Sequence, residues 1–256
     1  MGYTFTRETN HMLDSDYRNY IVMSKSNHSY AINNQIVTKL NSRSWAGRRC
    51  FIIGGGESLK GFDFSRLNNE LTIGINKSFE CYPKATINYS MDVAFYNKLQ
   101  QGQFKDINGN NLWDRWVDFQ GIRVFLTPMG KKEFGKELYL VRREWKPIIN
   151  KQNLDNGIYG GANSGVGAIN LAISLGSTEI YLLGYDLKCV AQTHWHNGYE
   201  PRELEKFNKK LKEYCVEITK LFASAKSVGV NIYNSNLNSA LKCFPYFDIN
   251  KKLGGN

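Results

Sequence analysis

The sequence predicts an α/β fold in which helices cover both faces of a Rossmann-like, doubly wound and mostly parallel sheet. Three observations support this prediction. Short apolar segments typical of buried strands recur along the chain, longer connections separate them, and a clear helix leads directly into one of them. The 256 residues, of which 42% are hydrophobic, suffice for one such domain with a sizeable core.

The predicted strands are residues 50–53, 71–75, 85–89, 122–126, 179–184 and 230–234. A helix is expected over residues 163–176, because Asn163 or Ser164 can cap its start and Gly176 can end it. A long amphipathic helix follows, with apolar residues at three- and four-residue spacing from Leu204 to Ala225.

The opposite face of that long helix carries charged side chains of both signs. Its lysines are expected to form a solvated face, because glutamates are interleaved with them. The lysines are Lys206, Lys209, Lys210 and Lys220, and the glutamates are Glu205, Glu213 and Glu217.

The chain divides into three parts by composition. Residues 1–45 are polar and asparagine-rich, so we expect an N-terminal extension without a fold of its own. Residues 46–245 hold all the predicted strands and form the expected Rossmann-like domain. Residues 246–256 are expected to be a loose C-terminal tail.

The chain carries a formal charge of +10, an excess that attracts polyanions such as nucleic acid, phosphorylated glycans or anionic lipid. The five cysteines form no C-x-x-C pair, so we expect neither a disulfide framework nor a zinc ribbon. No apolar stretch reaches the roughly 18 residues of a membrane helix, and the start of the chain lacks a signal-peptide pattern. The expected location is the cytoplasm of a bacterium or of a virus-infected cell.

The most informative motif follows the first predicted strand, residues 50–53. In order, it comprises Gly54, Gly55, Gly56, Glu57 and Ser58. Glycines let backbone amides approach an anion closely, and a following helix adds the positive end of its dipole. The motif predicts a phosphate cradle, although the same residues also suit a plain turn, since neither G-x-G-x-x-G spacing nor a Walker lysine is present.

Ligands of doubly wound folds bind at the carboxyl ends of the strands. The residues expected there, besides the glycine motif, are Asn76, Asn88 to Asp92, and Tyr185 to Lys188, which include Asp186. His194 and His196 follow the same strand as Asp186, and histidine is the side chain most easily tuned to accept a proton near neutral pH. The two histidines therefore suit a general base, or else a surface loop in which they only form hydrogen bonds. Zinc-type spacing is absent, so no structural metal is expected.

Two further acidic positions have local explanations. Asp92 suits contact with a metal-bound phosphate and equally suits a helix N-cap. Residues 106–111 imitate the start of a calcium loop, but Asn111 replaces the required glycine and Val117 the required glutamate. We therefore expect an ordinary turn at residues 106–111.

Three blocks of sequence, in one order, carry a family resemblance. They are residues 53–60 with 74–76, then 163–165 with 179–186, then His196 with 234–235. Together these blocks resemble the bacterial sialyltransferases that modify surface lipooligosaccharides, and the wider Rossmann-like family that includes archaeal hydroxymethylpterin pyrophosphokinases. The resemblance spans about residues 48–240.

The resemblance implies a single-domain variant of the glycosyltransferase type A fold and a nucleotide-sugar donor of the CMP or UDP type. It implies that the donor contacts Gly54, Gly55, Gly56, Ser58, Asn76, Ser164 and Gly165. It also implies that His196, before the long helix, is the general base. Glu57, Asn163, Tyr185 and Asp186 lie beside these positions and complete the expected donor site.

The chain departs from the sialyltransferase pattern at several positions. The family has asparagine in place of Gly55 and proline in place of Glu57, and the arginine before its Thr-Ser-Gly is absent here. Lys188 stands where the family has the tyrosine that assists the leaving group, and its ammonium can neutralise a departing phosphate. Nucleotide use survives these changes better than a sialic acid donor does.

The first functional hypothesis is therefore a glycosyltransferase that moves a sugar from a nucleotide donor to an acceptor hydroxyl. The acceptor is either a surface glycan or a hydroxymethylated base in viral DNA, which the positive charge favours. A magnesium-dependent, pyrophosphokinase-like enzyme and a non-catalytic nucleotide-binding module are the alternatives. In the kinase, Asp92 or Asp186 would hold magnesium. A homo-oligomer is compatible with all of these hypotheses.

Overall fold

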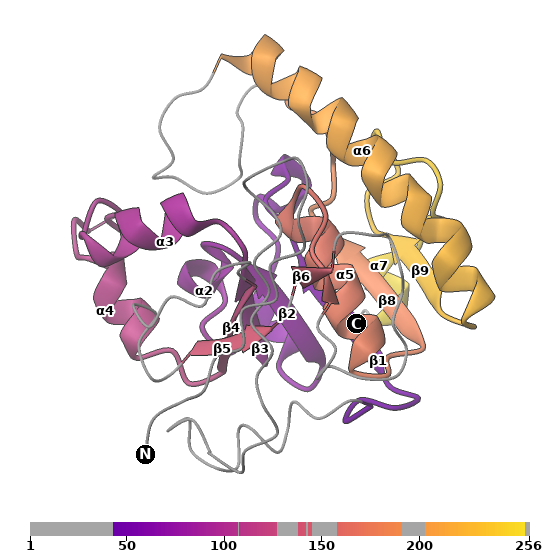
Figure 1. Cartoon of the computed structure of the whole chain (residues 1–256), viewed down its shortest axis with the longest axis horizontal. Helices are drawn as coiled ribbons and strands as arrows, with labels where there is room; N and C mark the ends of the chain where they lie inside the picture. Colours follow the sequence, from indigo (N-terminus) through magenta and orange to yellow (C-terminus); the bar gives the residue numbers. More distant parts are fainter. Residues whose placement is uncertain are drawn as a thin grey trace, which may run out of the picture.

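The computed structural model describes residues 43–106, 108–126, 138–141, 143–144, 158–190 and 203–253. These residues form an α/β fold around one sheet, with α2, α3 and α4 on the side of the molecule away from α6 (Figure 1). The predicted fold class is confirmed.

The main sheet has seven strands in the order β5-β4-β3-β2-β1-β8-β9, and every pairing between them is parallel. Their bounds are β1 Arg49–Ile53, β2 Leu71–Ile75, β3 Ile87–Ser90, β4 Ile122–Leu126, β5 Leu138–Val141, β8 Glu179–Leu183 and β9 Asn231–Asn234. A separate two-stranded pair joins β6, Arg143–Glu144, to β7, Ile158–Tyr159.

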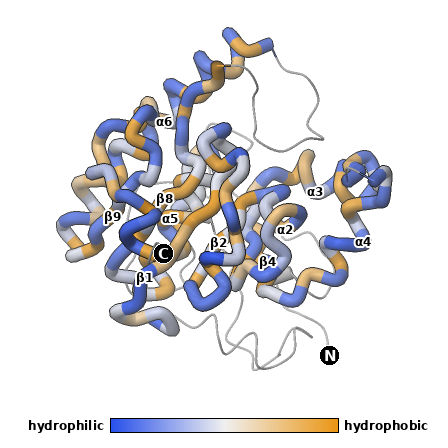
Figure 2. Tube along the Cα trace, turned by 180° about the vertical axis from the view of Figure 1, so that it is seen from behind, coloured by the Kyte–Doolittle hydropathy of each residue, from blue (hydrophilic) through white to orange (hydrophobic). Residues whose placement is uncertain are grey.

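The two longest helices, α5 and α6, lie in the second half of the chain, and the other helices are short. They are α2 Ser78–Cys81, α3 Val93–Gln100, α4 Leu112–Val117, α5 Ser164–Ser174, α6 Leu204–Ser227 and α7 Ile249–Lys252, with 3-10 turns at η1 Glu57–Leu59 and η2 Phe64–Leu67. In α6, hydrophobic and hydrophilic residues alternate around the helix, as its amphipathic pattern predicts (Figure 2). Within the described part of the chain, none of the helices is both long and apolar enough to cross a membrane.

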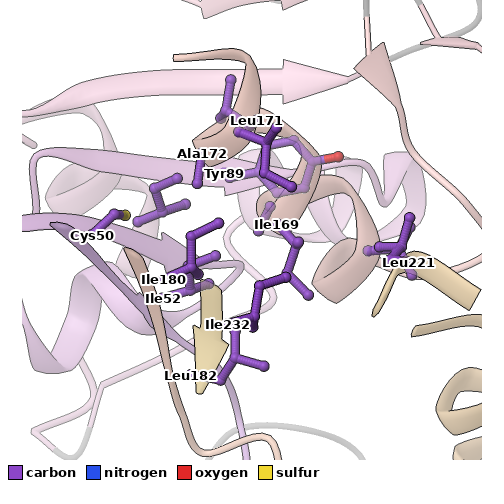
Figure 3. Close-up of a cluster of buried hydrophobic side chains, with 14 of the residues drawn as sticks. Cys50, Ile52, Tyr89, Ile169, Leu171, Ala172, Ile180, Leu182, Leu221 and Ile232 are labelled. Carbon is purple, nitrogen blue, oxygen red and sulfur yellow. The ribbon is translucent and has the colours of Figure 1, made fainter. Parts of the chain in front are cut away.

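The central strand β1 is apolar throughout because both faces of the sheet are covered. Cys50 and Ile52 face a core shared with α5 and α6, whereas Phe51 and Ile53 face a second core shared with α2, α3 and α4. Figure 3 shows the first core, where side chains of β1, β8 and β9 meet those of α5, with Leu221 of α6 at its side.

Helix α5 packs closely on the sheet through small residues. A Cβ atom on Gly167 would lie 1.9 Å from the hydroxyl oxygen of Tyr89 on β3. The backbone of α5 therefore approaches β3 at a distance that only glycine allows.

All six predicted strands are present, with small shifts in their ends. The strand expected at residues 85–89 pairs from Ile87, because the Thr86 amide donates to the Thr72 hydroxyl (2.9 Å) in place of a ladder bond. Strand β5 was not predicted. The chain at Ile249–Lys252 forms helix α7, capped by Asp248, where the composition predicted a loose tail.

Candidate functional site

The sheet reverses its strand order at β1. The chain continues from β1 to β2 on one side and returns much later to place β8 on the other. In doubly wound sheets, ligands bind in the crevice at the carboxyl end of this switch point. At this end of the sheet lie the glycine motif after β1, the segment from Tyr185 after β8, and the start of α5.

The glycine motif packs against the end of β8. The Gly54 amide donates to the Leu183 carbonyl and the Gly56 amide to the Gly184 carbonyl, both at 2.8 Å. A Cβ on Gly54 would lie 2.7 Å from the Gly184 oxygen, and one on Gly56 would lie 2.6 Å from the same oxygen. These two glycines therefore serve close contact between neighbouring chain segments, whereas the sequence interpretation assigned their amides to an anion.

Gly55 differs from the glycines on either side. Within the described residues its amide has no hydrogen-bond partner, and its φ is not positive. The Gly55 amide is thus the one of the three glycine amides that remains for a ligand.

Asp186 ties the motif to the end of the chain's last strand. Its carboxylate, in a side chain only 5% exposed, accepts bonds from the Ser58 amide (2.8 Å), the Ser58 hydroxyl (2.5 Å) and the Asn236 side chain (2.8 Å). Ser58 and Asp186 therefore bind each other, so they position the site through the shape of the loop. Asn236 was missed as a site residue, although the polar run after the last strand signalled it.

Asn76 joins the same edge of the sheet from β2. Its φ of 51° is left-handed, a conformation that asparagine tolerates better than most residues. The Asn76 amide donates to the Tyr89 carbonyl (2.9 Å), and its side-chain oxygen accepts from the Ser90 hydroxyl (2.8 Å). The side-chain NH₂ of Asn76 has no partner among the described residues, so it can donate to a ligand.

The start of α5 offers backbone amides. Asn163 is the N-cap, and its side-chain oxygen accepts from the Val166 amide (3.1 Å). The next two amides, of Ser164 and Gly165, have no hydrogen-bond partner in the described ranges, nor does the Ser164 hydroxyl. Free amides at the positive end of a helix dipole form an anion site when a ligand is present.

Tyr185 lies between the glycine motif and the start of α5. Its ring lies 3.2 Å from the Cβ position of Gly54 and 3.1 Å from that of Gly165, and its hydroxyl donates to the Gly165 carbonyl (3.1 Å). Burial raises the pKa of Tyr185 well above its ordinary value, so the phenol stays protonated and keeps that bond. Tyr185 is thus a buried spacer between the glycine motif and α5.

Lys188 is exposed at the same edge, two residues after Asp186. Beside it, Cys189 forms two backbone bonds with the Asn208 side chain of α6 (2.8 and 2.9 Å). Burial, with the charges of Glu57 and Asp186, raises the pKa of Cys189 to about 11. Glu57 therefore lies near this edge as well.

The two candidate bases, His194 and His196, lie outside the described residues, so their role stays a prediction. The segment that contains them starts after Val190 and ends before Glu203, the N-cap of α6.

The acidic groups of the described chain do not fit a magnesium site. Asp92 caps α3 by accepting from the Phe95 amide (3.0 Å), and Asp186 already accepts three bonds. No group of three His, Cys, Asp or Glu side chains in the described ranges is arranged to hold a metal ion. Asp106 accepts from the Asn108 and Asn110 amides (both 2.8 Å), which confirms the predicted turn.

No protein-family model and no curated protein matches the chain. Among solved structures, it is similar to the sialyltransferase CstII from Campylobacter jejuni in complex with cytidine-5'-monophosphate. That match has 16% identity and a TM-score of 0.44, and covers 79% of this chain and 85% of CstII.

A second similar structure is the MAf glycosyltransferase from Magnetospirillum magneticum AMB-1. It has 13% identity and a TM-score of 0.48, over 81% of this chain and 35% of that protein, so this chain spans about a third of its length. At these identities the roles of individual residues depend on the geometry of the chain itself.

Proposed function

We propose that this chain is a glycosyltransferase that binds a nucleotide-sugar at the switch point between β1 and β8. The observation that carries the proposal is a set of backbone amides that have no hydrogen-bond partner among the described residues, those of Gly55, Ser164 and Gly165. They come from two segments that the ring of Tyr185 holds together. Amides in this arrangement suit the phosphate of a nucleotide.

The reaction requires little more from the protein than a phosphate site and a base. A bond forms between the acceptor oxygen and the anomeric carbon of the sugar, while the bond from that carbon to the donor phosphate breaks. Charge then develops on the phosphate, where the α5 dipole and the free amides stabilise it. The acceptor proton goes to His196 in this proposal, and the exposed ammonium of Lys188 faces the departing phosphate.

The donor is tested by a thermal-shift screen of the full chain with CMP, UDP, GDP and ADP, followed by calorimetric titration of the hits. CMP is included because CstII was solved with it. We expect at least one nucleotide to raise the melting temperature by mass action. The absence of binding by all four would overturn the proposed donor site.

The acceptor follows from the charge of the chain. The formal charge of +10 suits a polyanionic acceptor, and we propose a hydroxymethylated base in DNA, with a surface glycan as the alternative. An assay of sugar transfer to hydroxymethylated DNA and to lipooligosaccharide separates the two acceptors.

The same assay addresses the kinase alternative. A pyrophosphokinase requires a divalent cation, so a chelator would abolish its activity. Transfer that persists in chelator supports the glycosyltransferase, as does the engagement of Asp92 and Asp186 in other bonds.

A further inference from the structure

Glu217 of α6 does not belong to the solvated face that the sequence predicted for it. Its carboxylate accepts from the Tyr159 hydroxyl (2.9 Å), from the Ala162 amide (2.8 and 2.9 Å to its two oxygens) and from the Asn163 side chain (3.0 Å). All three donors lie on the segment that leads from β7 into α5. One carboxylate therefore holds both ends of this segment.

The element that presents Glu217 is firmly anchored. Its neighbours on α6, Ile218 and Leu221, are buried in the core beneath α5. Gly161, with a φ of 62°, makes room for the carboxylate, because a Cβ there would lie 2.7 Å from the Glu217 oxygen. The contact is thus built into the packing of the two helices.

The contact also determines how Asn163 caps α5. The side-chain NH₂ of Asn163 donates to Glu217, so its oxygen is turned toward the Val166 amide. This division leaves the Ser164 and Gly165 amides as the open donors at the helix start. A reversed Asn163 amide would put its NH₂ against the Val166 amide and remove the cap.

We propose that Glu217 is a positioning residue for the donor phosphate, acting from α6 through Asn163 and the start of α5. The proposal rests on the proposed donor site. It requires an acceptor at every oxygen of residue 217, because the hydroxyl and amides that face it all donate. Glutamine lacks this property, since its NH₂ would face the Asn163 NH₂ or the Ala162 amide.

The test is titration of the full-length protein with CMP and UDP, each paired with its nucleoside, cytidine or uridine. For Glu217→Gln we expect an affinity for the nucleotide about tenfold weaker and an unchanged affinity for the nucleoside, since only the phosphate uses the start of α5. The matched control is Glu213→Gln, which removes the same charge from an exposed position one turn away on α6 and should bind as the original protein does.

A second variant keeps the test decisive if Glu217→Gln does not fold. In Glu217→Gln with Asn163→Asp, the new carboxylate accepts from Gln at position 217 and from the Val166 amide, and the net charge is conserved. This pair should recover most of the lost nucleotide affinity.

The outcomes separate the two proposals. If the original protein binds neither CMP nor UDP, and GDP and ADP also fail to bind, the donor site itself is wrong. If it binds them and Glu217→Gln matches Glu213→Gln, or loses nucleoside and nucleotide affinity equally, the positioning role is wrong while the donor site stands. If Glu217→Gln does not fold, failure of the paired variant to bind nucleotide overturns the positioning role.

Discussion

Gly55 and Gly56 are adjacent in the chain but have different tasks. The Gly56 amide donates to the Gly184 carbonyl, whereas the Gly55 amide has no hydrogen-bond partner in the described part of the chain. A substitution at Gly55 therefore tests ligand binding, and a substitution at Gly56 tests stability. Each serves as the control for the other.

Gly55→Val should weaken nucleotide binding without unfolding the protein. The φ at Gly55 is not positive, so no left-handed backbone opposes valine, whose branched side chain would occupy the space proposed for the anion. We expect an affinity at least about tenfold lower, corresponding to the loss of one hydrogen bond to a charged group. Calorimetric titration measures the affinity. Unchanged affinity in a folded variant would show that the phosphate does not bind at Gly55.

Gly56→Ala, in contrast, should lower the stability of the fold. Its Cβ would lie 2.4 Å from Asp186 Cγ, a carboxylate held by Ser58 and Asn236, so the loop must shift. We expect a loss of about 1–3 kcal/mol in the free energy of unfolding. Urea denaturation measures this change, and a stability equal to that of the original protein would show that the contact relaxes freely.

His196→Ala should lower turnover by about a hundred- to ten-thousand-fold, the usual contribution of a general base. His194→Ala should have the smaller effect, and both variants should bind nucleotide normally. Steady-state kinetics with saturating donor provide the comparison. A larger effect at His194 would mean that the base is two residues earlier than the resemblance implies.

At the scale of elements, helix α5 depends on a close approach to β3 at Gly167. Gly167→Ala adds helix propensity of about 0.5–1 kcal/mol in an ordinary helix, but here its Cβ would lie 1.9 Å from the Tyr89 hydroxyl. We therefore expect a net loss of about 1–3 kcal/mol in unfolding free energy.

The matched test of this contact is Tyr89→Phe combined with Gly167→Ala. Removing the hydroxyl relieves the closest overlap, although the ring carbon at 2.7 Å remains. Partial recovery in a double-mutant cycle is the expected result. A cycle without coupling would place the strain of Gly167→Ala elsewhere.

The elements were predictable where a local pattern carries their reason. The apolar strands and the run of small residues in α5 follow from burial alone, and Asn163 is an N-cap by its chemistry. Glu217 was misassigned because a sequence pattern shows spacing on one helix and not the segment packed against it. The bonded amides of Gly54 and Gly56 depend on β8, which lies far along the chain, so the motif alone could not reveal them.

At the scale of the whole molecule, the charge of +10 predicts a salt-dependent interaction with DNA. If the acceptor is DNA, binding to plain duplex should fall about a thousandfold between roughly 50 and 200 mM salt, as expected for six or more phosphate contacts. Fluorescence anisotropy with a labelled duplex measures this slope. If the affinity for duplex does not change with salt, or if no binding occurs at the lowest salt, a surface glycan becomes the favoured acceptor.

The central place of β1 also bears on how the protein is made. Strand β1 can pair with β2 only after Leu71–Ile75 has been synthesised, and its other edge must wait for Glu179–Leu183 of β8. The growing chain therefore presents an unpaired strand edge until most of it has left the ribosome, which is a state prone to association. The crevice lined by both halves is completed only with β8, so a nucleotide can stabilise the finished protein but cannot assist the early steps of its folding.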